Sequence, residues 1–190
     1  MLEAACEVVS RLGVGAMTLE AVAAQAGVSK GGLLYHFPNK NALILGMIKR
    51  MEQQFEADIA AEIEREEAAG SAPVAGRWLR AYVRVSLQEA DEIDAMHAAL
   101  MAPIYEDPEL LHSMQVAEAR WQQQAENDGV AVPIATVVWL AADGYWLSKV
   151  FGFKAAYSVP EKLQEIRQTL LNLIESGLLE NRVAPELESL

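Results

Sequence analysis

Hydrophobic residues recur along this chain with the three- to four-residue spacing of amphipathic helices. No segment shows the sustained alternation of apolar and polar residues that predicts a β-strand. Prolines indicate breaks at Pro103 and at Asp107–Pro108, and a loose acidic tail is expected from Glu180. The pattern predicts an all-α fold with helices near residues 2–12, 19–26, 29–36, 40–69, 73–90, 91–102, 106–127, 133–152 and 160–177.

Residues 18–40 have the spacing of a helix-turn-helix. Thr18 is expected to cap a short helix that Gly27 ends, and Ser29 is expected to cap the next one. Two short helices joined by a tight glycine turn are typical of proteins that insert the second helix into the major groove of DNA. The sequence therefore predicts a DNA-binding head near the N-terminus, with residues 29–36 as its recognition helix.

Small residues begin this predicted recognition helix, and hydrogen-bond donors cluster at its far end. Gly31 and Gly32 each cost a helix about 1 kcal/mol relative to alanine, so a close approach of the backbone to DNA or to another helix is needed to explain them. The hydroxyl, imidazole and ammonium groups of Tyr35, His36 and Lys40 could reach DNA phosphates. The ring of Tyr35 could instead lie half in the core, because it is amphipathic.

The same stretch resembles the tetracycline-repressor (TetR) family of one-component transcription regulators over about residues 2–50. A Leu-Tyr-His-Phe-x-x-Lys segment after Gly-Val-Ser-Lys-Gly-x is specific to that family rather than to helix pairs in general. The resemblance implies a three-helix DNA-binding head, a fourth linking helix, and a larger helical body that dimerises and encloses a small-molecule pocket. The residues that carry it are Thr18, Leu19, Val22, Ala23, Ala26, Gly27, Val28, Ser29, Lys30, Gly31, Leu33, Tyr35, His36, Phe37, Lys40, Leu43 and Ile44.

The resemblance also implies a division of the chain and a set of DNA contacts. A helix-turn-helix DNA-binding domain is expected over residues 1–45, joined by a long helix to a helical ligand-binding and dimerisation domain over residues 46–190. In such proteins, ligand binding typically changes the separation of the two heads and releases the DNA. The expected DNA-binding residues are Thr18, Ser29, Lys30, Gly31, Gly32, Tyr35, His36 and Lys40.

The net charge of -12 argues against DNA binding until its distribution is considered. Residues 1–50 carry a net charge of +2, and residues 51–190 carry -14. An acidic body lowers non-specific affinity for DNA without forbidding a local basic face. The single cysteine, Cys6, and the lack of a signal peptide or a transmembrane-length apolar run favour a cytoplasmic protein that does not enter a membrane.

The helices expected near residues 133–152 and 160–177 predict a homodimer. The first is apolar on nearly every side, and the second carries an apolar stripe at helical spacing. Exposed together on a monomer, they would form too large an apolar patch for a soluble protein. A two-fold dimer through these helices would also suit a palindromic operator in double-stranded DNA. The stripe on the second helix comprises Leu163, Ile166, Leu170, Leu173, Ile174 and Leu178.

Aromatic and methionine residues concentrate between residues 78 and 151, where they can form core or line a pocket for a small-molecule effector. Asp143 lies in an apolar helix and needs a partner or a pocket if it is buried. Such a pocket would favour a mostly apolar, aromatic or acyl-type ligand without strong charge, and no cofactor is expected. The candidate pocket residues are Trp78, Tyr82, Met101, Tyr105, Trp121 and Asp143.

A metal-binding helical bundle is the alternative from another class. Asp94 with His97, and Glu109 with His112, each place a carboxylate and an imidazole at positions i and i+3 of a helix. Pairs at that spacing build di-metal sites in helical bundles. The sequence therefore leaves open a metal site formed by these four residues.

A di-metal site would also need inward-facing glutamates from two other helices, and Glu118 and Glu89 are both expected at the surface. The chain has no phosphate-binding glycine loop, nucleophile elbow or paired cysteines, so we do not expect an enzyme. A purely structural helical adaptor would leave Lys30, Tyr35 and Lys40 unexplained. A DNA-binding regulator accounts for more of the sequence than either alternative.

Overall fold

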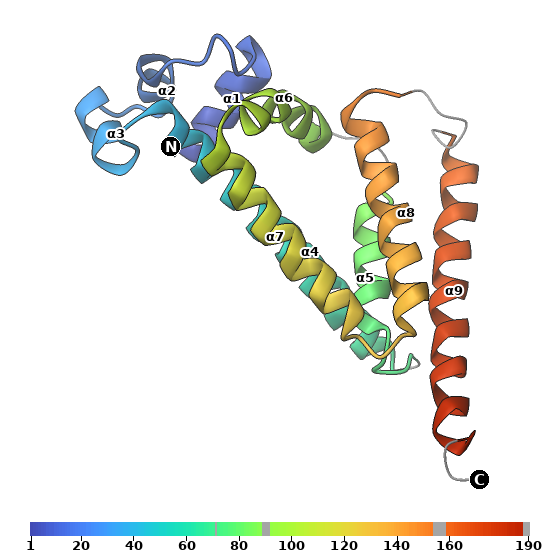
Figure 1. Ribbon diagram of the computed structural model, residues 1–190. Helices are drawn as coiled ribbons and strands as arrows, with labels where there is room; N and C mark the ends of the chain where they lie inside the picture. Colours follow the sequence, from blue (N-terminus) through green and yellow to red (C-terminus); the bar gives the residue numbers. More distant parts are fainter. Residues whose placement is uncertain (71, 89–91, 154–158, 188–190) are drawn as a thin grey trace. The chain divides into compact units, whose positions relative to one another are not determined.

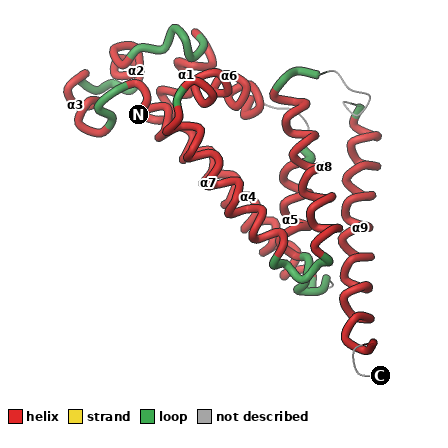
Figure 2. Tube along the Cα trace, in the orientation of Figure 1, coloured by secondary structure: helices red, strands yellow, loops and turns green. Residues whose placement is uncertain are grey.

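The computed structural model describes residues 1–70, 72–88, 92–153 and 159–187, without the side chains of 92–95 and 179–187. Over these residues the regular structure is helical throughout, which confirms the predicted all-α fold (Figures 1 and 2). No described helix is both long and apolar enough to cross a membrane. The helices are α1 (Leu2–Leu12), α2 (Leu19–Gln25), α3 (Lys30–His36), α4 (Lys40–Ala69), α5 (Arg77–Ser86), α6 (Glu92–Glu106), α7 (Pro108–Glu126), α8 (Val132–Val150) and α9 (Pro160–Leu187).

Several predicted helix ends are wrong, and α5 is shorter than the predicted helix over residues 73–90. Helix α6 runs through Pro103, where we expected a break. Proline removes one backbone donor, but the residues after it complete the final turn, and the Asp107 amide donates to the Pro103 carbonyl over 3.1 Å. Helix α9 continues to Leu187, although a loose tail was expected from Glu180.

The chain divides into two compact units, and the first comprises Met1–Gln54 and Ala90–Ala117. Within it, α1 packs on α2, α2 packs on α3, and α6 packs on α1. Its most deeply buried large side chains come from α1, the loop before α2, α2, α3, α4 and the helices after residue 90. They are Val8, Met17, Val22, Leu33, Leu43, Ile44, Met47, Leu100 and Leu110.

The second unit comprises Phe55–Glu89 and Glu118–Leu190, and its centre is formed by α5, α8 and α9, which pack against one another (Figure 1). Helix α9 turns its apolar stripe toward this core, where Leu163, Leu170, Ile174 and Leu178 are buried. The stripe that we expected on a subunit surface is therefore packed inside the unit, and over residues 161–178 the exposed side of α9 is polar.

Buried ion pairs join the end of α4 to α5. Arg80 is 3% exposed, and its guanidinium donates to Glu66 from Nη2 (2.6 Å) and Nε (3.0 Å). It also donates to the carbonyls of Pro73 (2.6 Å) and Ala75 (3.0 Å). Burial raises the pKa of Glu66, but the hydrogen bonds from Arg80 and Arg84 outweigh it and leave that pKa lower than usual. The buried charge is thus paired, and the loop between the helices is held by the same side chain.

Helix α5 begins where the backbone comes close to neighbouring chain segments. Gly76 has a φ of +77°, and a Cβ there would lie 2.8 Å from Ile174 and 2.9 Å from Nη1 of Arg80. Its amide donates to the Asp128 carbonyl over 2.6 Å, and the Asp128 carboxylate accepts from the Leu79 amide over 2.8 Å. Glycine fits this position because it tolerates both the positive φ and the close contact.

An acidic pair links three helices of the second unit. Tyr82 of α5 donates from its hydroxyl to Asp143 of α8, and the Glu118 carboxyl of α7 also hydrogen-bonds to Asp143. Burial, and then the neighbouring Asp143, raise the pKa of Glu118 to about 8. Glu118 therefore keeps its proton at neutral pH and donates it to Asp143. This position corrects the expectation that Glu118 lies at the surface, while Glu89 lies outside the described residues.

This pair predicts a stability that falls as the pH rises. Glu118 has a folded pKa of about 8, above its value of 4.5 in the unfolded chain, so the folded state holds an extra proton between these values. The stability it contributes is complete below pH 4.5 and is lost as the pH rises through 8. Because 1 kcal/mol corresponds to roughly 2–4 °C in a chain of this size, thermal unfolding can measure the loss.

We expect Glu118→Gln to unfold at a temperature that changes less between pH 5.5 and 8.5 than in the wild type, since its amide can donate to Asp143 without titrating. Glu161→Gln, at an exposed position of α9, is the control and should keep the wild-type dependence. An identical pH dependence in wild type and Glu118→Gln would contradict the assignment of the shared proton.

Candidate nucleic-acid interface and ligand pocket

Helix α3 presents the predicted recognition surface. The Ser29 hydroxyl accepts the Gly32 amide over 3.0 Å and so begins the helix as expected. Leu33 is fully buried, which fixes the orientation of the helix on the core of the first unit. That orientation leaves Lys30 and Gly31 exposed at the start of the helix, with Gly32 half-buried beside them.

The glycine pair does not serve close packing within the described part of the chain. A Cβ at Gly31 would meet the Ser29 hydroxyl at 4.0 Å, and a Cβ at Gly32 would meet the same atom at 3.3 Å. Neither would contact another helix. Close packing against another described helix is therefore not the reason for these glycines, and the close contact at Gly32 is with the capping hydroxyl of Ser29.

The end of α3 carries two exposed rings. Tyr35 is 85% exposed, so its ring is not part of the core. The Tyr35 and His36 rings lie edge to face, with centroids 5.1 Å apart. This arrangement holds a hydroxyl and an imidazole at the surface, where they are accessible to a phosphate backbone.

Thr18 and Lys40 have partners inside the first unit. The Thr18 hydroxyl caps α2 by accepting the Ala21 amide over 3.1 Å. Lys40 is half-buried, and its Nζ donates to the carbonyls of Val14 (2.7 Å) and Gly15 (3.4 Å). Both side chains therefore order the loop that leads into α2. The sequence did not reveal the contacts of Lys40, because they depend on how the start of α4 packs beside that loop.

Lys30 also has a partner that the sequence did not reveal. Its Nζ lies 2.5 Å from Oε1 of Glu20 on α2, and both side chains are more than half exposed. The hydrogen bond from Lys30 is the main cause of a lowered pKa at Glu20. The first base-contacting candidate of α3 is thus already engaged by an acidic group in the free protein.

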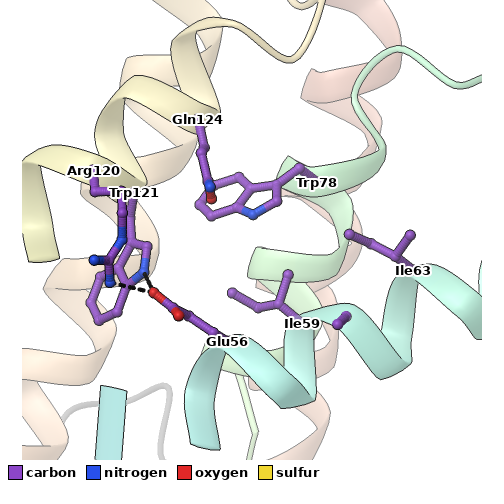
Figure 3. A pocket seen from close by; sticks show the side chains of 8 residues that line it. Glu56, Ile59, Ile63, Trp78, Arg120, Trp121 and Gln124 are labelled. Atoms are coloured by element: carbon purple, nitrogen blue, oxygen red, sulfur yellow. Dashed lines mark hydrogen bonds and ion pairs between the residues drawn. The ribbon is translucent and has the colours of Figure 1, made fainter. Parts of the chain in front are cut away.

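The second unit contains a pocket of about 390 Å³ between α4, α5 and α7 (Figure 3). Two indole rings, from Trp78 and Trp121, face its interior, and aliphatic side chains of α4 line another side. Its polar groups come from Glu56, Arg120 and Gln124. The lining residues are Glu56, Ile59, Ala60, Ile63, Trp78, Arg120, Trp121 and Gln124.

Aromatic contacts hold the wall of this pocket in place. Trp78 stacks on Tyr82 with a centroid distance of 5.1 Å. Phe55 packs against Trp121 at 5.0 Å and against Tyr82 at 5.6 Å. The Trp121 indole donates to Glu56 over 3.1 Å, and Arg120 pairs with the same carboxylate. The pocket therefore has a rigid aromatic wall and a polar edge.

The six predicted pocket residues do not share one place. Trp78 and Trp121 line the pocket, whereas the hydroxyl of Tyr82 is turned to Asp143 behind the aromatic wall. Met101 and Tyr105 belong to the first unit, where Met101 is buried and Tyr105 is 66% exposed. The polar residues at the pocket edge are Glu56, Arg120 and Gln124, and none of them was among the candidates.

The metal-binding alternative gains no support. Among the described residues, no three side chains of the ligand-forming types come together to hold a metal. Glu109 and His112 are exposed on α7, and the side chain of Asp94 lies outside the described part of the chain. Glu118, the inward-facing glutamate, is bound to Asp143 instead.

Helix α8 leaves an apolar face uncovered in the single chain. Val137 and Leu140 are both 56% exposed, and Leu147, which lies seven residues after Leu140, is 38% exposed. Ala141 and Gly144 lie among them and are also exposed. Large apolar and small residues together on one helical face suit a close helix–helix contact.

Two family descriptions match this chain: "Tetracyclin repressor-like, C-terminal domain" over residues 76–175, and "Bacterial regulatory proteins, tetR family" over residues 1–47. The HTH-type transcriptional regulator RutR of Escherichia coli (strain K12) is 32% identical over 113 residues, which cover 56% of this chain and 50% of RutR. The chain therefore spans about half the length of the curated relatives it matches.

The fold is also similar to solved structures. A transcriptional regulator from Rhodococcus sp. Rha1 has a TM-score of 0.70 at 20% identity, covering 93% of this chain and 94% of that one. A regulator from Saccharomonospora viridis in complex with choline has a TM-score of 0.66 at 21% identity, covering 92% and 93%. Since the C-terminal family match alone covers more than half of the residues, the chain belongs to the tetracycline-repressor family of transcriptional regulators.

Proposed function

We propose that the protein is a homodimeric, cytoplasmic, non-enzymatic regulator that binds a palindromic operator through α3 and is released by a small, mostly apolar molecule. The observation that carries the proposal is the surface of α3: a capped helix with two glycines that meet no other helix, an exposed lysine and two exposed rings. Repression is the expected output, because operator occupancy blocks transcription until the effector binds.

DNA binding would use the two ends of the recognition helix differently. Ser29, Lys30 and the glycines would enter the major groove, where lysine can bind guanine acceptors. Thr18, Tyr35, His36 and Lys40 would contact phosphates, which fix the position of the helix but do not read sequence. Two heads about 34–36 Å apart would read the two halves of a palindrome.

We expect the protein to shift DNA flanking its own coding region in an electrophoretic mobility assay at physiological salt. The double substitution Lys30→Ala and Lys40→Ala should weaken this binding by roughly 10-fold or more, since the base contact of Lys30 alone would contribute about 1–3 kcal/mol. The control is the double substitution Arg65→Ala and Lys162→Ala, which removes the same charge from exposed positions of the second unit. Equal losses in the two double variants would contradict the placement of the interface.

The uncovered face of α8 supports a two-fold dimer. Val137, Leu140 and Leu147 would be removed from water in such an interface, and the small residues Ala141 and Gly144 would let the two copies of α8 approach closely. An isologous interface uses the same surface patch on both subunits, so each of these residues enters the interface twice. The polar exposed side of α9 would contribute at the edge of the interface rather than at its apolar centre.

Leu140→Glu should convert the dimer to monomers in analytical ultracentrifugation, because the two-fold axis brings two buried carboxylates into one interface. The monomer should also lose most of its operator affinity. Val74→Glu introduces the same charge at an apolar position that is 74% exposed elsewhere in the unit, and it should leave the dimer intact. A Leu140→Glu variant that sediments as the wild type does would rule out this face.

The pocket of the second unit supports binding of a small, mostly apolar effector. Its volume of about 390 Å³ lies within the usual range for small-molecule sites. Flat aromatic ligands could stack on Trp78 or Trp121 and use the polar edge for one hydrogen bond. A structural relative was solved with choline, which supports the use of this fold for small ligands. The DNA-bound dimer holds its two heads at one spacing. An effector that binds better to a dimer with another spacing would shift the population away from the DNA-bound form.

Ala60→Trp should fill this pocket and abolish the rise in unfolding temperature that apolar aromatic compounds give in a thermal-shift screen of the wild type. Operator binding should remain but lose its response to those compounds. Ala61→Trp is the matched control, because the next residue of α4 is also exposed but does not line the pocket. Hits that are all strongly polar or anionic, or that stabilise Ala60→Trp as well as the wild type, would contradict this ligand class.

A further inference from the structure

The contact between Lys30 and Glu20 joins the start of the recognition helix to the helix before it. The ammonium and carboxylate lie 2.5 Å apart, with 55% of the Lys30 side chain and 61% of the Glu20 side chain exposed. The other two acidic residues among residues 1–50 lie on α1, where Glu7 accepts a hydrogen bond from Gln25. Glu20 is therefore the acidic side chain of this segment that faces the recognition helix.

We propose that Glu20 is a specificity-determining residue, which holds Lys30 away from DNA phosphates and releases it when the groove offers a matching base. The inference rests on the proposed binding of operator DNA through α3. Glu20 is an acidic residue of α2, and its proposed role differs from that of every expected DNA-contacting residue.

The chemistry of lysine makes such a partner useful. An ammonium on a flexible stem is a compact point charge that binds any phosphate within reach, whatever the sequence. While Lys30 is paired with Glu20, binding to a phosphate only exchanges one anion for another. A guanine in the right position offers two acceptors, O6 and N7. At such a site Lys30 exchanges Glu20 for these acceptors with a gain in binding free energy.

The contact between Glu20 and Lys30 matters for the charge of residues 1–50. Residues 1–50 carry a net charge of only +2, so removing one carboxylate changes that charge by half. Lys40 is already engaged by two backbone carbonyls, which limits its reach. Lys30 is the exposed lysine of α3, so its pairing with Glu20 affects how strongly this helix attracts DNA of any sequence.

A purely structural role for the pair makes a different prediction. Exposed ion pairs contribute about 0–1 kcal/mol to stability, and this one would act by fixing the angle between α2 and α3. Its loss would then weaken binding to operator and random DNA alike, because the helix would be less well placed. The proposed role instead predicts stronger binding to random DNA.

The test compares Glu20→Gln with the wild type on two duplexes, one carrying the operator mapped by mobility shift and one of random sequence, over a range of salt concentrations. We expect affinity for the random duplex to rise roughly 3- to 10-fold, and the slope of log affinity against log salt to steepen by about one unit, as for one added phosphate contact. Operator affinity should change less, so the ratio of specific to non-specific affinity should fall. Thermal unfolding should show little change.

Two controls separate this role from a simple change in net charge. Glu7→Gln removes the same charge from the same unit without touching α3, and it should leave the ratio of affinities unchanged. Adding Glu20→Gln to a Lys30→Met background should also have no effect on that ratio. An equal response to Glu7→Gln and Glu20→Gln, or an effect that persists without Lys30, would overturn the inference. A wild-type protein that binds no specific DNA would instead overturn the proposed function.

Discussion

The second unit depends on the buried contact between Arg80 and Glu66. Moving a guanidinium and a carboxylate out of water costs several kcal/mol for each ion, so the pair persists because its geometry satisfies both partners. Arg80 bonds both oxygens of Glu66 and two loop carbonyls at once. These directional bonds set where α5 lies along the last turns of α4, which apolar packing alone would leave less defined.

The ligand pocket follows from that placement. Ile59 and Ile63 come from α4, Trp78 comes from α5 two residues before Arg80, and α7 supplies Trp121. Behind them, Tyr82 is fixed by Asp143 and by its stacking on Trp78. A ligand therefore meets walls that are already ordered, which lowers the entropic cost of binding.

Local signals in the sequence predicted the first helices and the surface of α3, because caps, glycine turns and apolar spacing act over a few residues. Thr18, Gly27 and Ser29 are examples, and each has the predicted cap or positive φ. Contacts between distant segments could not be predicted in the same way. Glu118 was expected at the surface because its helix is polar. Its partner Asp143 lies on the next helix along the chain, so the contact depends on how the two helices pack.

Two lysines of the proposed DNA-binding head are engaged within the free protein, which constrains how it can work as a regulator. Lys40 is bound to carbonyls and Lys30 to Glu20, so each must give up a partner before it contacts DNA. Joining two such heads makes the second binding event intramolecular, which raises the affinity only when the spacing of the heads matches the operator. A ligand that reverses such binding must favour the released form, by about 5.5 kcal/mol for a shift from 1:99 to 99:1. In the proposed function, the engaged lysines of the head and the apolar face of α8 would together make tight binding depend on the dimer, whose head spacing a small molecule could change.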